Sequence, residues 1–291
     1  MDLASAQSVL VSGFLLGSLY AMMATGLSLV WTTLGIFNFA HGVFMTLGAY
    51  VAWQVSTAQG FGLGVAAGVA LGVAALFGIG CLSEIVLVRR FLKRRDVVMI
   101  AVITTLAAAI FLENSIQLVW GPKLKKLAPL IEGNVRIIGV AISAHEALIL
   151  GIAPATLLIL WVFLKWTLLG SAIRAVGQNR ELAALLGMNE RALFGLAFGL
   201  SAGLAALAGI LLGSRSFITP ELGNEPLVKA LIVAIFGGLG SLMGTIGGAY
   251  MIGLLEAFSI FFIGLYWTPA ALFGVMIVTL LIRPTGLFGR R

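Results

Sequence analysis

Charged residues are scarce in this sequence. Only 10% of its 291 residues are Asp, Glu, Lys or Arg, whereas 60% are hydrophobic. A soluble domain usually carries about 25% charged residues, because its surface must be hydrated. The few charges here fall in short clusters between long apolar runs, as expected for helices that each cross a bilayer with about 20 apolar residues. We therefore predict an all-α integral membrane protein, built as a polytopic helical bundle.

Residues that could support chemistry are also few. Cys81 is the only cysteine, and His41 and His145 are the only histidines. A single cysteine cannot form an intramolecular disulfide, and no zinc-binding spacing such as HExxH occurs. We predict no catalytic residue and no metal site, which makes an intramembrane enzyme the least favoured interpretation.

Apolar runs recur along the whole chain. No basic residue precedes Arg89, so the first run lacks the charged start of a cleavable signal and is expected to be a retained span. The run 228–262 is too long for one straight crossing and contains three glycines between positions 237 and 240. We expect it to form two spans or a broken or re-entrant helix, which brings the total to about eight or nine transmembrane segments. The candidate spans are 8–31, 41–58, 61–88, 97–119, 145–165, 192–213, 228–262 and 266–282.

Basic residues divide unevenly between the two sets of connections. Because Lys and Arg collect in cytoplasmic loops, the richer set predicts an outer N-terminus, a cytoplasmic C-terminus and an odd number of crossings. The formal net charge is +7, and the basic residues that cause it lie beside apolar runs. This position favours a signal for membrane orientation over nucleic-acid binding. The richer set is Arg89, Arg90, Lys93, Arg94, Arg95, Lys165, Arg174, Arg180, Arg191, Arg283, Arg290 and Arg291; the other is Lys123, Lys125, Lys126, Arg136, Arg215 and Lys229.

Glycine is abundant, with 37 residues, and several glycines recur at every fourth position, as in Gly195, Gly199 and Gly203. This spacing places them on one helix face and lets two backbones approach closely. We predict tight helix packing; a seam along which helices slide during transport is the alternative.

Polar residues inside the apolar runs are the candidates for a translocation path, because such groups are costly in hydrocarbon. Asn38 and His41 lie in the sequence FNFAHG, at a break between two runs that suggests a discontinuous helix. Glu256 lies deep in the last long run. Each of the three could instead form a structural hydrogen bond. Glu84 precedes Arg89 closely and is expected to form a salt bridge or to reach the membrane surface.

The connection after the fifth span contains a predicted short helix. Asn179 is a suitable N-cap, Glu181 suits the first turn, and Gly187 suits the position after the last turn. Three leucines lie on one face of this helix and need a covering surface, either membrane headgroups or a groove on a soluble partner. These leucines are Leu182, Leu185 and Leu186.

Three segments carry a resemblance to a known family. They are GLSLVWTTLGIFNFAHGVFMTLGAY (26–50), IRAVGQNRELAALLGMN (173–189), and KALIVAIFGGLGSLMGTIGGAYMIGLLEA (229–257) followed by RPTGLFGR (283–290). In this order and over nearly the whole chain, the sequence resembles branched-chain amino acid ABC transporter permeases of the LivH type.

The resemblance implies a single permease domain, 1–291, in the bacterial inner membrane. It implies a second related permease, two cytoplasmic ATPases that use ATP and Mg, and an extracytoplasmic solute-binding protein as partners. The segment that couples to the ATPases would then consist of Asn179, Arg180, Glu181, Leu182, Leu185, Leu186 and Gly187. The chain itself would bind no cofactor and lacks the phosphate-binding pattern GxxxxGK[ST], so another protein would handle ATP.

The function implied by the resemblance is import of a small solute by alternating access, driven by the partner ATPases. Branched-chain or related amino acids are the expected solutes; urea, amides and aromatic acids are the alternatives within the wider family. An ion-coupled secondary transporter or channel is the alternative function. It would be expected to carry several facing acidic residues within the membrane, and the short leucine helix would then have no purpose.

Overall fold

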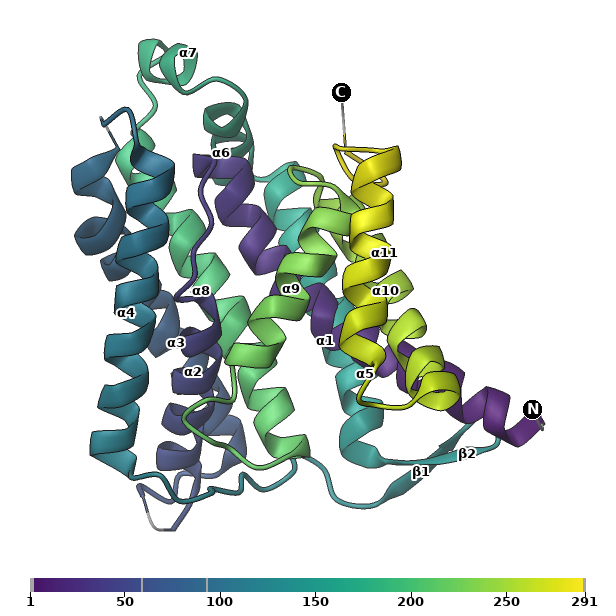
Figure 1. Ribbon diagram of the computed structural model, residues 1–291. Helices are drawn as coiled ribbons and strands as arrows, with labels where there is room; N and C mark the ends of the chain where they lie inside the picture. Colours follow the sequence, from purple (N-terminus) through teal and green to yellow (C-terminus); the bar gives the residue numbers. More distant parts are fainter. Residues whose placement is uncertain (1–2, 59, 93, 290–291) are drawn as a thin grey trace. The chain divides into compact units, whose positions relative to one another are not determined.

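The computed structural model describes residues 3–58, 60–92 and 94–289 (Figure 1). The chain is mainly helical in this part. The α-helices are α1 (Leu3–Leu34), α2 (His41–Ser56), α3 (Val65–Ser83), α4 (Val97–Trp120), α5 (Ala144–Trp166), α6 (Leu168–Gln178), α7 (Arg180–Leu185), α8 (Glu190–Arg215), α9 (Asn224–Gly237), α10 (Leu242–Ile263) and α11 (Thr268–Ile282). A π-helical turn, η1 (Glu84–Val88), and a 3-10 turn, η2 (Arg89–Phe91), continue α3.

Six helices in the described residues are long and apolar enough to cross a bilayer: α1, α3 with its continuation, α4, α5, α8 and α10. The protein is therefore a polytopic helical membrane protein. Three further segments counted among the eight or nine predicted spans are shorter, with 16 residues in α2, 14 in α9 and 15 in α11. At 1.5 Å per residue, each covers about 21–24 Å, less than the hydrocarbon thickness of about 30 Å.

The prediction that 228–262 contains a break is confirmed. The chain leaves α9 at Gly237 and enters α10 at Leu242, with positive φ angles at Gly238 (106°) and Gly240 (98°). Such angles are easily reached only by glycine. Residues near the C-terminus cover the free carbonyls at the end of α9: the Leu287 amide donates to Phe236 O at 2.9 Å.

The predicted helical fold is present, with one addition that the prediction did not include. The connection between α4 and α5 contains a hairpin of β1 (Asn134–Ile137) and β2 (Val140–Ser143), paired antiparallel. Its two turn residues, Ile138 and Gly139, both have positive φ angles, 50° and 81°. Positive φ at both central residues is the requirement of a tight type I′ turn, whose twist matches that of the strands.

The chain forms two compact units, and α1, α5 and α9 contribute residues to both. Unit 1 comprises Met1–Ser28, Pro129–Leu157 and Val228–Arg291; unit 2 comprises Leu29–Ala128 and Leu158–Leu227.

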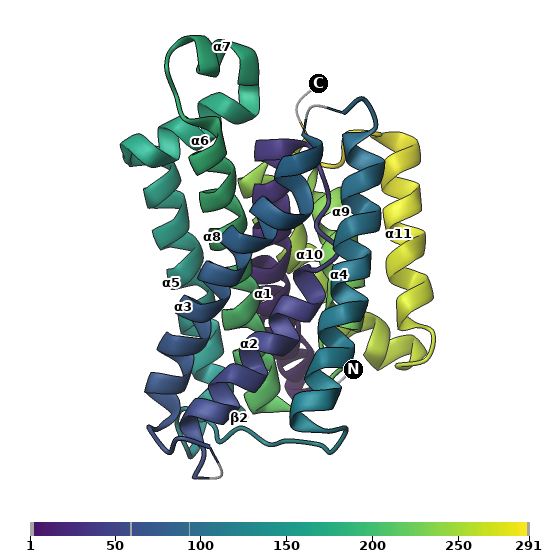
Figure 2. The same ribbon diagram turned by 90° about the vertical axis from the view of Figure 1, so that its left-hand side faces the viewer.

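Unit 2 is organised around α2, α3 and α8, which pack against one another, with α4 beside α2 (Figure 2). Glycines allow the close approach: a Cβ atom on Gly48 of α2 would lie 2.6 Å from the Ala206 Cα atom of α8. A Cβ atom on Gly80 of α3 would lie 2.6 Å from the Phe198 carbonyl oxygen. Of the three glycines named for this packing, Gly199 lies in close contact, with Cys81 Sγ 2.6 Å from an added Cβ atom, whereas the nearest atoms to one added at Gly195 or Gly203 lie at 3.7 Å.

Unit 1 contains a comparable contact between α1 and α10. A Cβ atom on Gly253 would lie 2.4 Å from the Gly17 backbone nitrogen, and one on Gly13 would lie 2.9 Å from Leu254 Cα. Polar side chains lie along the same contact, where Thr245 Oγ1 donates to Ser28 Oγ at 3.2 Å.

Substitution of Gly209 should test the helix seam of unit 2. A Cβ atom there would lie 2.1 Å from the Met45 carbonyl oxygen of α2, so Gly209→Ala should force α8 away from α2. We expect the free energy of unfolding to fall by about 1–3 kcal/mol, which would be observed as a lower melting temperature of the purified protein in detergent.

Gly203→Ala on the same helix is the matched control. The nearest atom to its added methyl group would be Val73 Cγ1 at 3.7 Å, an ordinary contact. Alanine favours helix by about 1 kcal/mol over glycine, so this variant should be as stable as the wild type or more stable. Equal melting temperatures for the two variants would contradict a closed seam at Gly209.

Candidate functional site

The short helix α7 is capped at both ends by the residues that the sequence suggested. Asn179 Oδ1 accepts the Leu182 amide at 2.9 Å. At the other end Gly187 has a φ of 80°, the Gly187 amide donates to Ala184 O at 3.0 Å, and the Met188 amide donates to Ala183 O at 3.1 Å. This pair of hydrogen bonds is the Schellman arrangement that ends a helix at glycine. The predicted helix boundaries are confirmed.

The three leucines of this helix project from unit 2 and are not covered by it. Leu182, Leu185 and Leu186 are 56%, 83% and 71% exposed, whereas Ala183 is buried. In Figure 2 α7 lies beyond the ends of α6 and α8. Leu182 and Leu185 on this helix of six residues and Leu186 at its C-cap form a small exposed apolar surface, which we call the leucine face.

Arg180 connects α7 to α8. Its guanidinium Nη2 donates to Glu190 Oε1 at 3.0 Å and its Nε to Glu190 Oε2, and the guanidinium lies 5.1 Å from the centre of the Phe194 ring. The hydrogen bonds to Glu190 raise the pKa of Arg180. Planar, bidentate Arg–carboxylate pairs restrict geometry more than a single contact does. Arg180 therefore points back to the first turn of α8 rather than outward with the leucines.

A second ion pair lies at the same end of α8. Glu84, fully buried in the π-helical turn, accepts from the Arg89 guanidinium, as the sequence predicted. Arg89 also donates to the Arg191 carbonyl oxygen at 3.1 Å. Glu190 and Arg191 are adjacent, so the first turn of α8 is connected both to α7 and to the end of α3.

Asn38 and His41 lie in unit 2 at the break between α1 and α2. Residues 35–40 are not helical, and both side chains are buried. Asn38 Oδ1 accepts the Ala40 amide at 3.1 Å, and His41 Nδ1 lies 3.2 Å from Ser201 Oγ of α8. The Asn38 amide nitrogen is buried with no acceptor among the described residues.

Glu256 lies in unit 1 as part of a buried network. Its Oε2 accepts from Tyr20 Oη of α1 at 2.5 Å, and its Oε1 accepts from Lys229 Nζ of α9 at 2.7 Å. The prediction that placed Lys229 in an outer connection is wrong, because α9 begins at Asn224 and Lys229 lies within it. Twelve residues and a chain reversal separate Lys229 from the start of α10, so no spacing rule could pair it with Glu256.

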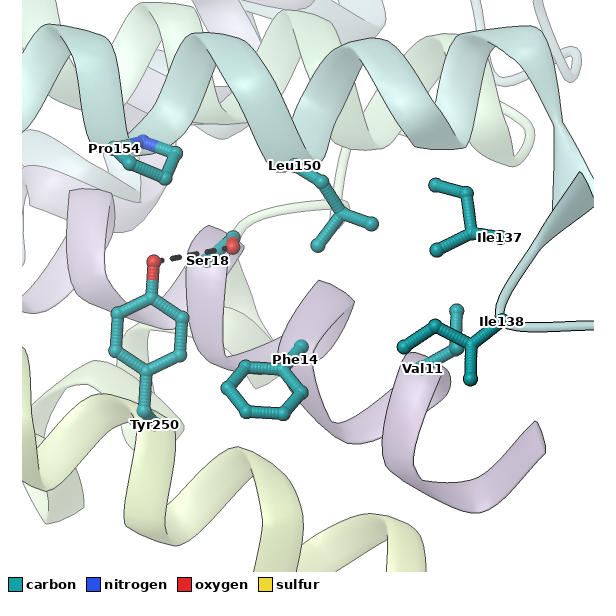
Figure 3. A pocket seen from close by; sticks show the side chains of 8 residues that line it. All are labelled: Val11, Phe14, Ser18, Ile137, Ile138, Leu150, Pro154 and Tyr250. Atoms are coloured by element: carbon teal, nitrogen blue, oxygen red, sulfur yellow. Dashed lines mark hydrogen bonds between the residues drawn. The ribbon is translucent and has the colours of Figure 1, made fainter. Parts of the chain in front are cut away.

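An apolar pocket of about 370 Å³ lies elsewhere in unit 1 (Figure 3). Side chains from α1, the hairpin, α5 and α10 line it, and its one polar contact joins Ser18 Oγ and Tyr250 Oη at 3.3 Å. Ser18 and Tyr20 are two residues apart and so face opposite sides of α1, which separates the pocket from the Glu256 network. The lining residues are Val11, Phe14, Ser18, Ile137, Ile138, Leu150, Pro154 and Tyr250.

Within the described residues no group of three or more His, Cys, Asp or Glu could hold a metal ion. The functional features are thus a projecting helix with an apolar face, its ion-pair connections, and a few polar groups buried among membrane helices.

The comparison with protein families agrees with these features. Residues 9–282 match the family described as the permease component of branched-chain amino acid transport systems. The chain belongs to this family. It is accordingly a transport subunit, a permease component, and a multi-pass protein of the inner (cell) membrane.

Individual relatives cover nearly the full length of this permease. It is 32% identical to the high-affinity branched-chain amino acid transport system permease protein LivH of Escherichia coli (strain K12), over 96% of this chain and 94% of that protein. It is also 32% identical to the corresponding protein BraD of Pseudomonas aeruginosa, over 97% and 95% of the two chains. A probable branched-chain amino acid transport permease protein LivH of Methanocaldococcus jannaschii is 27% identical, over 97% and 92%.

A solved structure supports the fold. PsaBC from Streptococcus pneumoniae, in complex with Fab, matches with a TM-score of 0.52 at 14% identity, and the match covers 98% of this permease and 94% of that chain.

Removal of the Asn179 side chain should loosen α7. The N-cap contributes about 1 kcal/mol, which corresponds to a roughly fivefold change in local opening. We expect amide hydrogen exchange in residues 180–187 to become about fivefold faster in Asn179→Ala. Asn179→Ser keeps an acceptor oxygen and should exchange like the wild type. An exchange rate in Asn179→Ala equal to that of the wild type would show that the cap does not hold the helix.

Proposed function

We propose that this permease is one membrane subunit of an ATP-binding-cassette importer that carries branched-chain or related amino acids inward by alternating access. The observation that carries the proposal is the leucine face: a helix capped at both ends, projecting from unit 2, with three exposed leucines and an ion pair to α8. Together with membership of the permease family, this favours docking into an ATPase groove over contact with lipid headgroups.

The energy source lies outside this chain. Two cytoplasmic ATPases would bind ATP and Mg, a second related permease would form the other half of the path, and an extracytoplasmic binding protein would deliver the solute. The relatives carry names of branched-chain amino acid transport systems, which supports these amino acids over urea, amides or aromatic acids.

The connections of α7 indicate how ATPase movement would reach the membrane. Arg180 and Glu190 tie α7 to the first turn of α8, and Arg89 ties that turn to the end of α3. α8 also packs closely on α2 and α3. A displacement of α7 would therefore move the start of α8, and the glycine seams would transmit that movement as a rigid shift of packed helices.

The path would use the polar groups buried among the helices. We retain Asn38, His41 and Glu256 as path candidates. Asn38 and His41 lie where the backbone is irregular, and irregular backbone at membrane depth occurs where protein or a water-filled cavity surrounds it. The amide nitrogen of Asn38 has no acceptor among the described residues and could donate a hydrogen bond to the carboxylate of a solute. These roles apply to the transporting states of the assembled importer.

Co-purification should test the proposal. We would express the chain with its neighbouring genes, purify it through a tag, and identify the bound proteins. A second permease and an ATPase should be recovered with the wild type. The triple variant Leu182→Asp, Leu185→Asp and Leu186→Asp should lose the ATPase, because three charges would enter an apolar groove.

Leu63→Asp is the matched control for that experiment. Leu63 is 61% exposed, like the leucine face, but lies in the connection between α2 and α3 at the other end of unit 2. It should retain the ATPase. A chain that purifies alone and moves solute in liposomes without ATP would overturn the importer and support the ion-coupled transporter, which the buried Lys229–Glu256 pair would suit.

The ion pair of Arg180 should be needed for coupling but not for docking. In Arg180→Glu the leucine face remains, so the ATPase should still co-purify. Repulsion from Glu190 should release α7 from α8, and uptake per ATP hydrolysed should fall about tenfold in proteoliposomes. The reversed pair, Arg180→Glu with Glu190→Arg, should recover much of the uptake. Normal uptake in the single variant would exclude this pair from the coupling route.

A further inference from the structure

The Lys229–Glu256 pair places two charges among membrane helices, where desolvation of charged groups costs free energy. Charged side chains at membrane depth are rare, and a buried ion pair is often no more stable than apolar residues of similar size. Glu256 lies about 21 Å from the start of α10, at 1.5 Å per residue, and about 10 Å from its end. The carboxylate therefore lies within the hydrocarbon depth, nearer the end that the orientation prediction places outside.

The two partners are held differently. The Glu256 side chain is 3% exposed and is fixed from the α1 side by the Tyr20 hydroxyl, whereas the Lys229 side chain retains 17% exposure. Lysine carries its charge on a flexible four-carbon chain, and here the ammonium lies 5.6 Å from the centre of the Tyr20 ring. If Lys229 moved away, Tyr20 would still hold the carboxylate in place.

We propose that this network is an intramembrane binding site for the head group of a zwitterionic amino acid. The solute carboxylate binds Lys229, and its ammonium binds Glu256, so that the zwitterion is inserted into the existing ion pair. Tyr20 and Glu256 form the fixed half of the site, and Lys229 forms the movable half. The inference rests on the proposed function, because it requires that an amino acid passes through this chain.

Charge balance is the physical reason for this assignment. Before insertion the positive charge of Lys229 and the negative charge of Glu256 are in contact. After insertion four charges alternate in sign, and no charge is left unpaired in a medium where an unpaired charge is very costly. A solute with only an ammonium or only a carboxylate can replace only one half of the Lys229–Glu256 contact. Such a site therefore selects zwitterions from singly charged analogues, and a neutral solute such as urea would not require it.

The order of events also follows from the exposure of the two side chains. The more accessible Lys229 meets the solute first, through the carboxylate. The ammonium then replaces Lys229 at the Glu256 oxygen that Lys229 occupied, while the other oxygen continues to accept from Tyr20.

Competition binding to the complete wild-type complex provides the first test. Radiolabelled leucine would be bound to the complex in nanodiscs without the binding protein, and displaced by unlabelled leucine, leucinamide or 4-methylpentanoate. Leucinamide lacks the carboxylate and 4-methylpentanoate lacks the ammonium. We expect each to compete at least tenfold more weakly than leucine. Equal competition by either analogue, or no leucine binding in a complex that transports leucine, would overturn the site.

A double variant separates binding from a purely structural ion pair. Lys229→Met with Glu256→Leu removes both charges of the pair together, which a purely structural pair should tolerate better than the loss of either charge alone. We expect leucine uptake by the purified, monodisperse complex to fall at least tenfold nonetheless. Uptake within twofold of the wild type would make the pair structural. If the wild-type complex failed to import leucine with ATP and the binding protein, the proposed function itself would be wrong. If the wild type and the double variant both imported leucine, the zwitterion site would be wrong and the proposed function would stand.

Discussion

Hydrocarbon offers no hydrogen bonds, and this constraint determines how the helices of this permease can be interrupted. Every backbone amide and carbonyl that leaves a helix at membrane depth must find a partner within the protein. At the α1–α2 break, the Phe39 amide donates to Thr105 Oγ1 of α4, and the Ala40 amide donates to the Asn38 side chain. At the α9–α10 break, which directly precedes the spanning helix α10, the residues after α11 supply donors in the same way. The breaks are possible because neighbouring segments complete them.

The same constraint explains the use of glycine. A helix that must satisfy its neighbour's backbone has to approach it closely, and in lipid close packing is also a main source of attraction between helices. The contacts of Gly48, Gly80 and Gly209 bring backbones of unit 2 to distances that a methyl group would prevent. Outside the membrane, water and side-chain caps take over this role: Asn179 and Gly187 cap α7, and the Arg180–Glu190 ion pair connects it to α8.

Local chemistry was predictable from the sequence, and long-range pairing was not. The caps of α7 depend on residues within nine positions of one another, and the break at 238–241 depends on glycines within it, so both were visible as patterns. The β-hairpin was missed because a positive φ at Ile138 is unusual for a β-branched residue, and no Asn-Gly or similar turn signal precedes it. The sequence identified Glu256 as a path candidate, but its partners lie on α1 and α9, and only the folded chain brings them together.

Two ion pairs of this permease differ in their exposure to solvent and therefore in the free-energy cost of separating their charges. Arg180–Glu190 is partly exposed, so each charge could be hydrated if the pair opened, and its contribution lies in geometry rather than in stability. Lys229–Glu256 is largely buried, with side chains that are 17% and 3% exposed, so separation of the pair would leave both charges poorly hydrated. In the proposed site, a zwitterion would supply a charge of each sign to the separated pair. The buried Lys229–Glu256 pair would thus restrict which solute can separate it. The exposed Arg180–Glu190 pair can move with α7, to which Arg180 belongs.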